Sequence, residues 1–179
     1  KLVFGRKLKE AKTSYLNTIP KESKVLIVGG GTGELLEILP SDALLKVDYL
    51  ELSEKMIAKA KVRNSNAFET NFIESDVLSH VGTYDVVIAN FLLDCFSQEL
   101  LGQVLVQLKN LMKLDAQLLV TDFALTTALK GRILNKMMHA FFKLTVNLSS
   151  SHLKDIRQIL LTSGFVEQDY IAHNHCYCF

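Results

Sequence analysis

Short apolar runs alternate with amphipathic stretches along most of the chain. The first run, at residues 25–28, is continuous in apolar side chains, as expected for a strand that is buried on both faces of a parallel sheet. The predicted strands are residues 25–28, 44–52, 67–73, 84–90 and 116–123. The predicted helices, where apolar positions recur at helical spacing, are residues 34–39, 54–62, 98–112 and 152–162. This alternation predicts an α/β fold with a doubly wound, mostly parallel sheet and helices on both faces.

Further elements are predicted at both ends of the chain. Residues 2–16 have apolar positions at roughly helical spacing, so the segment 1–20 is predicted to form an N-terminal helix followed by a turn. Gly164 is predicted to cap the C-terminus of the last helix. Residues 165–171 and 176–179 are predicted to form a terminal hairpin. This hairpin would complete a seven-stranded sheet in which the terminal strand is antiparallel.

Closely spaced glycines follow the first predicted strand directly. Gly29, Gly31 and Gly33 let the backbone turn sharply and bring its N–H groups close to a ligand. The helix predicted after them would direct its positive end to the same place. This geometry fits a nucleotide-type ligand. The spacing differs from the dinucleotide-binding fingerprint, in which the third glycine falls where Glu34 stands.

Polar side chains stand at the ends of the next three predicted strands. Glu51 lies about 20 residues after the glycine turn, where doubly wound sheets place the carboxylate that accepts hydrogen bonds from ribose hydroxyls. Asp76 follows the third strand, and Asn90 ends the fourth. Because ligands of open α/β sheets bind outside the carboxyl ends of the strands, we expect these side chains to face one ligand.

Four segments resemble, in order and separation, the successive motifs of class I S-adenosylmethionine-dependent methyltransferases. The segments are VLIVGGGTGELLEIL, YLELSEKMIAKA, ESDVL and YDVVIANFLLDCF. The resemblance covers residues 24–123 well and the remainder more loosely. It implies a single Rossmann-like methyltransferase domain over residues 1–179, with S-adenosylmethionine as the cofactor and S-adenosylhomocysteine as the product.

The resemblance also implies a role for each motif. The glycine loop would lie behind the methionine and ribose part of the cofactor. Glu51 would accept the ribose hydroxyls, and Asp76 would accept the adenine amino group. Asn90 and Phe91 would border the methyl donor. The full set of implied cofactor-binding residues is Gly29, Gly30, Gly31, Gly33, Glu51, Leu52, Asp76, Val77, Asn90 and Phe91.

One position departs from the pattern of this family. Its members usually carry an acidic residue two positions before the first glycine, where this chain has Ile27. The departure removes the usual polar tether of the methionine amino group. Asp94 is the residue that could replace it.

Composition and charge narrow the functional classes. The 179 residues suit one domain with a full core, and the hydrophobic fraction of 49% is ordinary for a globular protein. A net charge of +1 gives no general attraction to nucleic acid or to an anionic membrane, so neither partner is expected. Cys95, Cys176 and Cys178 are odd in number, and no secretory or membrane-spanning apolar segment is visible. This pattern predicts a reduced, cytoplasmic protein.

Residues 125–150 lie where this family often builds its acceptor pocket. Their apolar side chains exceed what one helix face requires, which is typical of a helix that covers the sheet or of an apolar cap over a small molecule. The two interpretations are compatible, and attachment to a membrane surface is disfavoured. We expect Phe91 and Leu92 to form an apolar acceptor wall with Met138 and Phe142, which lie four residues apart on one predicted helix face.

Methyl transfer from a sulfonium needs alignment and exclusion of water more than it needs reactive side chains. A general base is required only if the acceptor must lose a proton. The first candidate is His139, on pKa grounds, followed by Asp94 and Asp122. His80 is predicted to lie in a surface loop.

Four residues near the C-terminus have the side chains of metal ligands. They are His173, His175, Cys176 and Cys178. Their spacing matches none of the closed metal sites such as C-x2-C, and alternate positions in a terminal strand explain the pattern. No metal is therefore predicted.

The sequence predicts an S-adenosylmethionine-dependent methyltransferase that acts on a small, apolar or aromatic acceptor. The alternatives are a tRNA or protein methyltransferase, or a noncatalytic module that binds a cofactor or a partner. Amino methylation of nucleic acids is disfavoured, because the segment Asn90-Phe91-Leu92-Leu93 lacks the two prolines of the corresponding motif. The acceptor, the type of bond and the oligomeric state stay open.

Overall fold

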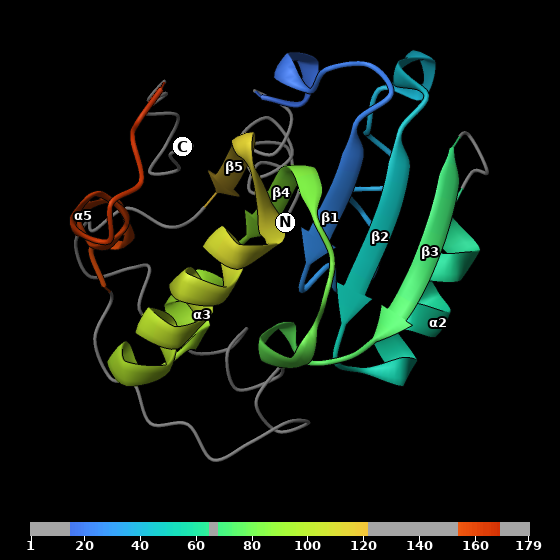
Figure 1. Ribbon diagram of the computed structural model, residues 1–179. Coiled ribbons are helices and arrows are strands. Elements are labelled where there is room, and N and C mark those ends of the chain that lie inside the picture. Colours follow the sequence, from blue (N-terminus) through green and yellow to red (C-terminus); the bar gives the residue numbers. More distant parts are fainter. Residues whose placement is uncertain (1–14, 65–67, 122–153, 169–179) are drawn as a thin grey trace, which may run out of the picture.

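The computed structural model describes residues 15–64, 68–121 and 154–168 (Figure 1). Most of the predicted N-terminal helix, the predicted acceptor-side segment 125–150 and the second strand of the predicted hairpin lie outside the described residues. Within the described part, no helix is long and apolar enough to cross a membrane.

Five parallel strands form one sheet in the order β3-β2-β1-β4-β5, as Figure 1 shows. The strands are β1 (Lys24–Val28), β2 (Lys46–Glu51), β3 (Glu69–Glu74), β4 (Tyr84–Asn90) and β5 (Met112–Thr121). Each overlaps one of the predicted apolar runs, so the predicted parallel α/β sheet is confirmed for these strands. The strand order reverses between β1 and β4, and open α/β sheets bind ligands at the carboxyl ends beside such a reversal.

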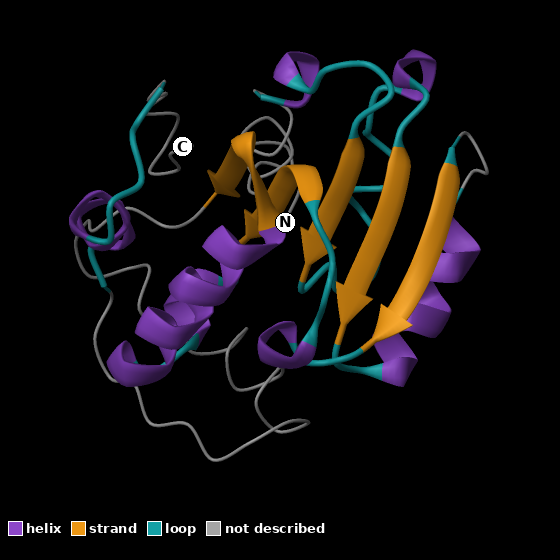
Figure 2. Ribbon diagram, viewed as in Figure 1, coloured by secondary structure: helices purple, strands orange, loops and turns teal. Residues whose placement is uncertain are grey.

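Apolar side chains fill both faces of the sheet, and β1 shows the alternation clearly. Val25 and Ile27 belong to one buried cluster, whereas Leu26 and Val28 belong to the other. The helix α3 (Gln98–Leu111) covers one face and α2 (Glu54–Arg63) the other, as Figure 2 shows. Burial of each large aliphatic side chain contributes about 1.5–3 kcal/mol. This two-sided core holds the strand ends in place.

The helix predicted over residues 34–39 does not form, and that prediction was wrong. The chain makes a series of tight turns there, in which the Leu39 N–H donates to the Leu35 carbonyl at 3.1 Å. Only six residues separate Gly33 from Pro40, too few for propagation to offset the cost of nucleating a helix. The glycine loop is therefore not followed by a helix dipole.

The helix α5 (Ile156–Thr162) ends as predicted. Gly164 has a φ of 80° and donates its N–H to the Leu161 carbonyl at 3.0 Å. The Phe165 N–H donates to the Leu160 carbonyl at 3.1 Å, which completes the Schellman arrangement of a helix C-terminus. The predicted glycine cap is confirmed.

The sheet does not extend into the segment that follows α5. Residues 165–168 form no strand, so the predicted hairpin strand over 165–171 is wrong for its described part. Arg157 of α5 binds Glu167 through two hydrogen bonds of 2.7 and 2.9 Å, which hold this segment beside its own helix. The described residues thus contain a five-stranded, fully parallel sheet instead of the predicted seven-stranded sheet with an antiparallel strand.

Candidate functional site

The carboxyl ends of β1 to β4 bring the described cofactor-binding candidates to one edge of the sheet. Glu51 ends β2 and lies beside Glu74, the last residue of β3. Val28 ends β1 and lies beside Ala89 of β4. The glycine loop follows Val28 directly, and Asp76 comes two residues after Glu74. The sequence prediction that these groups share one edge is therefore confirmed.

The path of the glycine loop depends on its lack of side chains. Gly30 lies directly on the ring of Tyr49, where a Cβ atom would come within 2.2 Å of the Tyr49 Cζ. The alternate glycines also have left-handed backbones, which L-residues with side chains rarely adopt. Their φ angles are 62° for Gly29, 65° for Gly31 and 84° for Gly33. The loop thus packs its backbone against β2 without any intervening side chain.

Four hydrogen bonds join this loop to β2, one of them from the Gly30 N–H to the Leu50 carbonyl at 3.4 Å. The Gly29 N–H donates to the Leu50 carbonyl at 2.8 Å, and the Gly31 N–H donates to Glu51 Oε2 at 2.9 Å. The Gly31 carbonyl accepts a hydrogen bond of 3.0 Å from the Tyr49 hydroxyl. Tyr49 and Glu51 are two residues apart on one strand and therefore lie on the same face. Both backbone polar groups of Gly31 are bound by this face of β2.

The Glu51 carboxylate has the hydrogen-bonding capacity that a ribose diol requires. Its Oε1 accepts the Ser53 N–H at 3.0 Å, so each carboxylate oxygen accepts one backbone N–H. A carboxylate oxygen has two lone pairs, which leaves one on each oxygen for a hydroxyl donor. The residue is 1% exposed, so a ligand that reaches this carboxylate must displace the atoms that cover it.

Asp76 presents an oriented carboxylate at the end of β3. Its Oδ1 accepts the Leu78 N–H at 2.9 Å and caps the short 3-10 helix η3 (Val77–Ser79). Val77 is buried in the core and anchors this turn, while the Asp76 side chain is exposed. Leu52 is 44% exposed at the end of β2. An exposed carboxylate at this position can accept a hydrogen bond from an amino group.

The end of β4 has an unusual backbone conformation. Asn90 is the last residue of the strand and is half-buried. Phe91 has a φ of 53°, and its N–H donates to the Thr121 carbonyl of β5 at 2.7 Å. A left-handed conformation at a bulky residue costs about 1–3 kcal/mol and tends to occur at functional sites. The role predicted for Phe91 next to the reacting group stays a prediction.

Ile27 and Asp94 lie in different surroundings. Ile27 is 2% exposed and packs in the apolar cluster that contains Leu35 and Leu36. Asp94 is 5% exposed in the short 3-10 helix η4 (Leu93–Cys95), directly after β4. Asp94 is therefore the acidic side chain nearest in sequence to the end of β4.

The comparison with known families agrees with this geometry. The profile of a family described as methyltransferase domain matches residues 26–118, more than half of the 179 residues. The chain belongs to the methyltransferase domain family. The predicted membership in the class I S-adenosylmethionine-dependent methyltransferases is thereby confirmed. No curated protein sequence matches the chain significantly.

Solved methyltransferases share the fold. CalO1, a methyltransferase in calicheamicin biosynthesis, is 18% identical with a TM-score of 0.70 over 99% of this chain and 53% of CalO1. Magnesium protoporphyrin IX methyltransferase from Synechocystis PCC 6803 is 21% identical with a TM-score of 0.63 over 97% of this chain and 84% of that protein. An O-methyltransferase family protein from Burkholderia thailandensis is 17% identical with a TM-score of 0.75, over 98% of this chain and 55% of its own.

These similarities bear on the cofactor as well as on the fold. The structures of CalO1 and of the Synechocystis enzyme contain S-adenosylhomocysteine. S-adenosylmethionine, the predicted cofactor, is thus supported by the ligand found in structures that share this fold. The chain spans about half the length of CalO1.

Several residues predicted for the site lie outside the described part of the chain. His139 and Asp122, two of the three candidate bases, lie outside the described residues, as do Met138 and Phe142 of the predicted acceptor wall. The four C-terminal residues considered as metal ligands lie outside them too. Among the residues that the structure describes, no three His, Cys, Asp or Glu side chains are arranged to hold a metal ion.

His80 is buried, which corrects its predicted place in a surface loop. Its Nε2 lies 2.6 Å from the Tyr84 hydroxyl, which donates to Asp48 Oδ2 at 2.7 Å. Because that hydroxyl gives its proton to Asp48, His80 must donate from Nε2. Burial lowers the pKa of His80, against the opposing effect of the Asp48 carboxylate and with a smaller contribution from Lys24. This network begins at the first residue of β4, away from the glycine loop.

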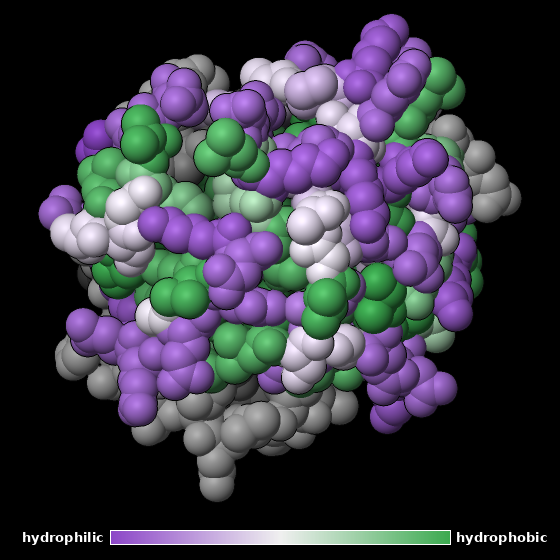
Figure 3. Space-filling view, in the orientation of Figure 1, coloured by the Kyte–Doolittle hydropathy of each residue, from purple (hydrophilic) through white to green (hydrophobic). Residues whose placement is uncertain are grey.

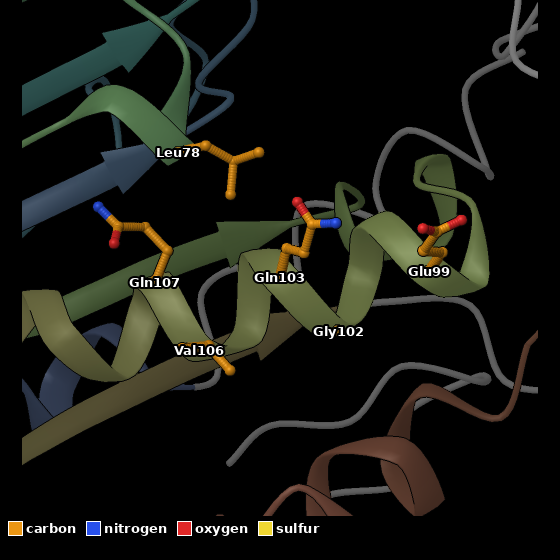
Figure 4. A pocket seen from close by; sticks show the side chains of 6 residues that line it. All are labelled: Leu78, Glu99, Gly102, Gln103, Val106 and Gln107. Atoms are coloured by element: carbon orange, nitrogen blue, oxygen red, sulfur yellow. The ribbon is translucent and has the colours of Figure 1, made fainter.

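A shallow groove of about 490 Å³ lies between η3 and α3 (Figure 4). Its lining residues are Leu78, Glu99, Gly102, Gln103, Val106 and Gln107. None of the predicted cofactor-binding residues is among them. On the face of the molecule that Figure 3 shows, apolar and hydrophilic residues are intermixed.

Proposed function

We propose that this chain binds S-adenosylmethionine at the carboxyl edge of β1 to β4 and transfers its methyl group to a small, apolar or aromatic acceptor. The observation that carries the proposal is the contact between the Gly31 N–H and Glu51 Oε2 at 2.9 Å, next to the reversal in strand order. It joins a glycine-rich loop to a carboxylate with spare hydrogen-bonding capacity, as a ribose ligand requires.

Each part of the cofactor has a matching group along this edge. Glu51 accepts the ribose hydroxyls, and Asp76 accepts the adenine amino group. The loop from Gly29 to Gly33 lies against the methionine and ribose part, while Asn90 and Phe91 border the methyl donor. The exposed Asp76 carboxylate and the paired N–H contacts of Glu51 support these assignments.

The bound cofactor supplies an electrophilic methyl group on a sulfonium. The chain contributes alignment and exclusion of water, which account for most of the catalysis in such a displacement. A proton acceptor is needed only for an acceptor that must lose a proton. Among the residues that the structure describes, Asp94 is the candidate for this role or for the tether of the methionine amino group. It is buried and follows the end of β4.

A small apolar acceptor is supported by position and by the similar structures. Phe91 and Leu92 follow β4 at the ligand-binding edge and begin an apolar wall that Met138 and Phe142 would complete. The similar structures include enzymes named for small molecules, such as the mitomycin 7-O-methyltransferase MmcR. A net charge of +1 offers little attraction to a polyanionic substrate.

A noncatalytic module with the same cofactor site is the second candidate. It is favoured by Ile27, which places an apolar, 2% exposed side chain where the family usually has an acidic one. Both functions predict cofactor binding, so binding alone does not separate them.

Incubation with S-adenosylmethionine that carries a labelled methyl group, together with a panel of apolar, aromatic and polar small molecules, tRNA and protein, separates the two candidates. The proposed enzyme labels an apolar or aromatic compound and releases S-adenosylhomocysteine in equal amount. Binding of S-adenosylhomocysteine without label transfer to any compound, tRNA or protein would favour the noncatalytic module. Transfer to tRNA or protein alone would contradict the proposed acceptor class.

A further inference from the structure

Tyr49 stands beneath the glycine loop, in the middle of a strand that is buried on both faces. We propose that Tyr49 is a positioning residue for the cofactor site, whose hydroxyl fixes the Gly31 backbone in the conformation that binds the ligand. This inference rests on the proposed function. It adds a residue that contacts neither the cofactor nor the acceptor and acts through Gly31.

The ring and the hydroxyl of Tyr49 make different kinds of contact. The ring is 0% exposed, packs with Phe72 at a centroid distance of 5.2 Å and fills the space below Gly30. The hydroxyl donates to the Gly31 carbonyl at 3.0 Å. A buried tyrosine hydroxyl requires a polar partner, and here that partner is the loop itself.

Gly31 is the position at which such an anchor matters most. It has a φ of 65°, and a Cβ atom there would meet nothing within 4 Å, so no neighbouring atom packs against that side of its Cα. Its N–H is bound by Glu51 and its carbonyl by Tyr49. Without the hydroxyl, the glycine gains access to backbone conformations in which the Glu51 contact is lost or weakened.

The hydroxyl remains a donor over the whole physiological pH range. Burial, together with the negative charge of Glu51, raises the pKa of Tyr49 far above its ordinary value. The neutral phenol therefore keeps its proton beside the carboxylate. A phenylalanine at this position would preserve the ring and delete the hydroxyl, with its contacts to the backbones of Gly31 and Gly33 in the same loop.

The effect on affinity depends on the fraction of molecules in which the glycine loop has the conformation that binds the ligand. A ligand that binds one loop conformation has an apparent Kd equal to its intrinsic Kd divided by the fraction of molecules in that conformation. One neutral hydrogen bond shifts such an equilibrium by about three- to tenfold. We expect the binding conformation to become the minor one when the hydroxyl is lost, so that most of this factor reaches the Kd. Tyr49→Phe should therefore raise the Kd for S-adenosylhomocysteine by more than about twofold and by up to about tenfold.

The test compares Tyr49→Phe with Tyr84→Phe in the full chain. Tyr84 is also 0% exposed, and its hydroxyl donates to the Asp48 carboxylate at 2.7 Å. It is the first residue of β4 and therefore lies at the amino ends of the strands, away from the glycine loop. Calorimetry gives the Kd for S-adenosylhomocysteine, and the melting temperature shows that each variant is folded. Amide hydrogen exchange at Gly31, followed by NMR, reports the loop conformation without ligand.

For Tyr49→Phe we expect a higher Kd for S-adenosylhomocysteine and faster amide exchange at Gly31. For Tyr84→Phe we expect both quantities to be unchanged, even if its melting temperature is lower. If the unmutated chain binds and Tyr49→Phe binds within twofold of it, the inference is overturned. If the unmutated chain does not bind, the proposed function fails. Gly31 exchange then decides the inference alone, and an unchanged rate in Tyr49→Phe overturns it.

Discussion

Replacement of Glu51 by alanine should reduce stability and cofactor affinity by separate amounts. In the absence of ligand, Glu51 accepts hydrogen bonds from the Gly31 and Ser53 N–H groups at 2.9 and 3.0 Å. A hydrogen bond to a charged group contributes about 1.5–3 kcal/mol. Gly31 and Ser53 are half-buried and regain some bonding to water, so the sum is reduced. We expect Glu51→Ala to lower the free energy of unfolding by about 2–4 kcal/mol.

The loss of affinity comes in addition, because the ribose hydroxyls lose a charged acceptor. It should amount to about 1.5–3 kcal/mol, which is one to two decades in the Kd for S-adenosylhomocysteine. Denaturant unfolding gives the stability of each variant. Calorimetry at a temperature where the variants remain folded gives the affinity per folded molecule.

Asp85→Ala is the matched control. The Asp85 carboxylate also accepts a backbone N–H, that of Lys24 at 2.9 Å, but it lies near the amino end of β4. This variant should lose stability and keep its affinity, and Asp94→Ala should lose less affinity than Glu51→Ala. An unchanged Kd in Glu51→Ala, with normal binding by the unmutated chain, would show that Glu51 only supports the loop and would refute the ribose assignment.

Three further predictions concern other parts of the fold. Asp76→Ala should weaken adenosine-containing ligands about tenfold while the lost cap costs about 1 kcal/mol of stability; an unchanged Kd would make Asp76 purely structural. Since folding lowers the pKa of His80, the free energy of unfolding should decrease as the pH falls below 6.5, and His80→Gln should flatten this decrease in denaturant titrations. Gly30→Ala should cost about 1–3 kcal/mol because its Cβ overlaps the Tyr49 ring. Gly102→Ala, with open space around its Cβ, should not destabilise the fold.

The sequence was sufficient for the sheet because its central strands, β1 and β4, are buried on both faces. Residues 86–89 of β4 are apolar on consecutive positions, which few structures other than a central parallel strand accommodate. The polar residues Glu51 and Asp76 could be placed at one edge because all carboxyl ends of a parallel sheet meet there.

The sequence was insufficient where contacts distant along the chain decide the structure. The segment between Gly33 and Pro40 has the apolar spacing of a helix but lacks the length to propagate one. His80 sits in a stretch with turn residues, and its burial depends on Tyr84 and on Gln107, whose Nε2 donates to the His80 carbonyl at 2.7 Å.

Tyr49 was not identified as a site residue from the sequence. Its apolar ring fits a buried strand, so the pattern of the run at 44–52 gave it no special role. The available signal was its position two residues before Glu51, on the same face, with a hydroxyl that requires a partner in a buried environment.

A crystal structure of the chain with S-adenosylhomocysteine tests the central claim most directly. The account predicts that the ribose hydroxyls lie within hydrogen-bonding distance of the two Glu51 oxygens, with the adenine amino group at Asp76 and the glycine loop against the ligand. A ligand bound elsewhere, or a Glu51 carboxylate that still contacts only Gly31 and Ser53, would contradict it.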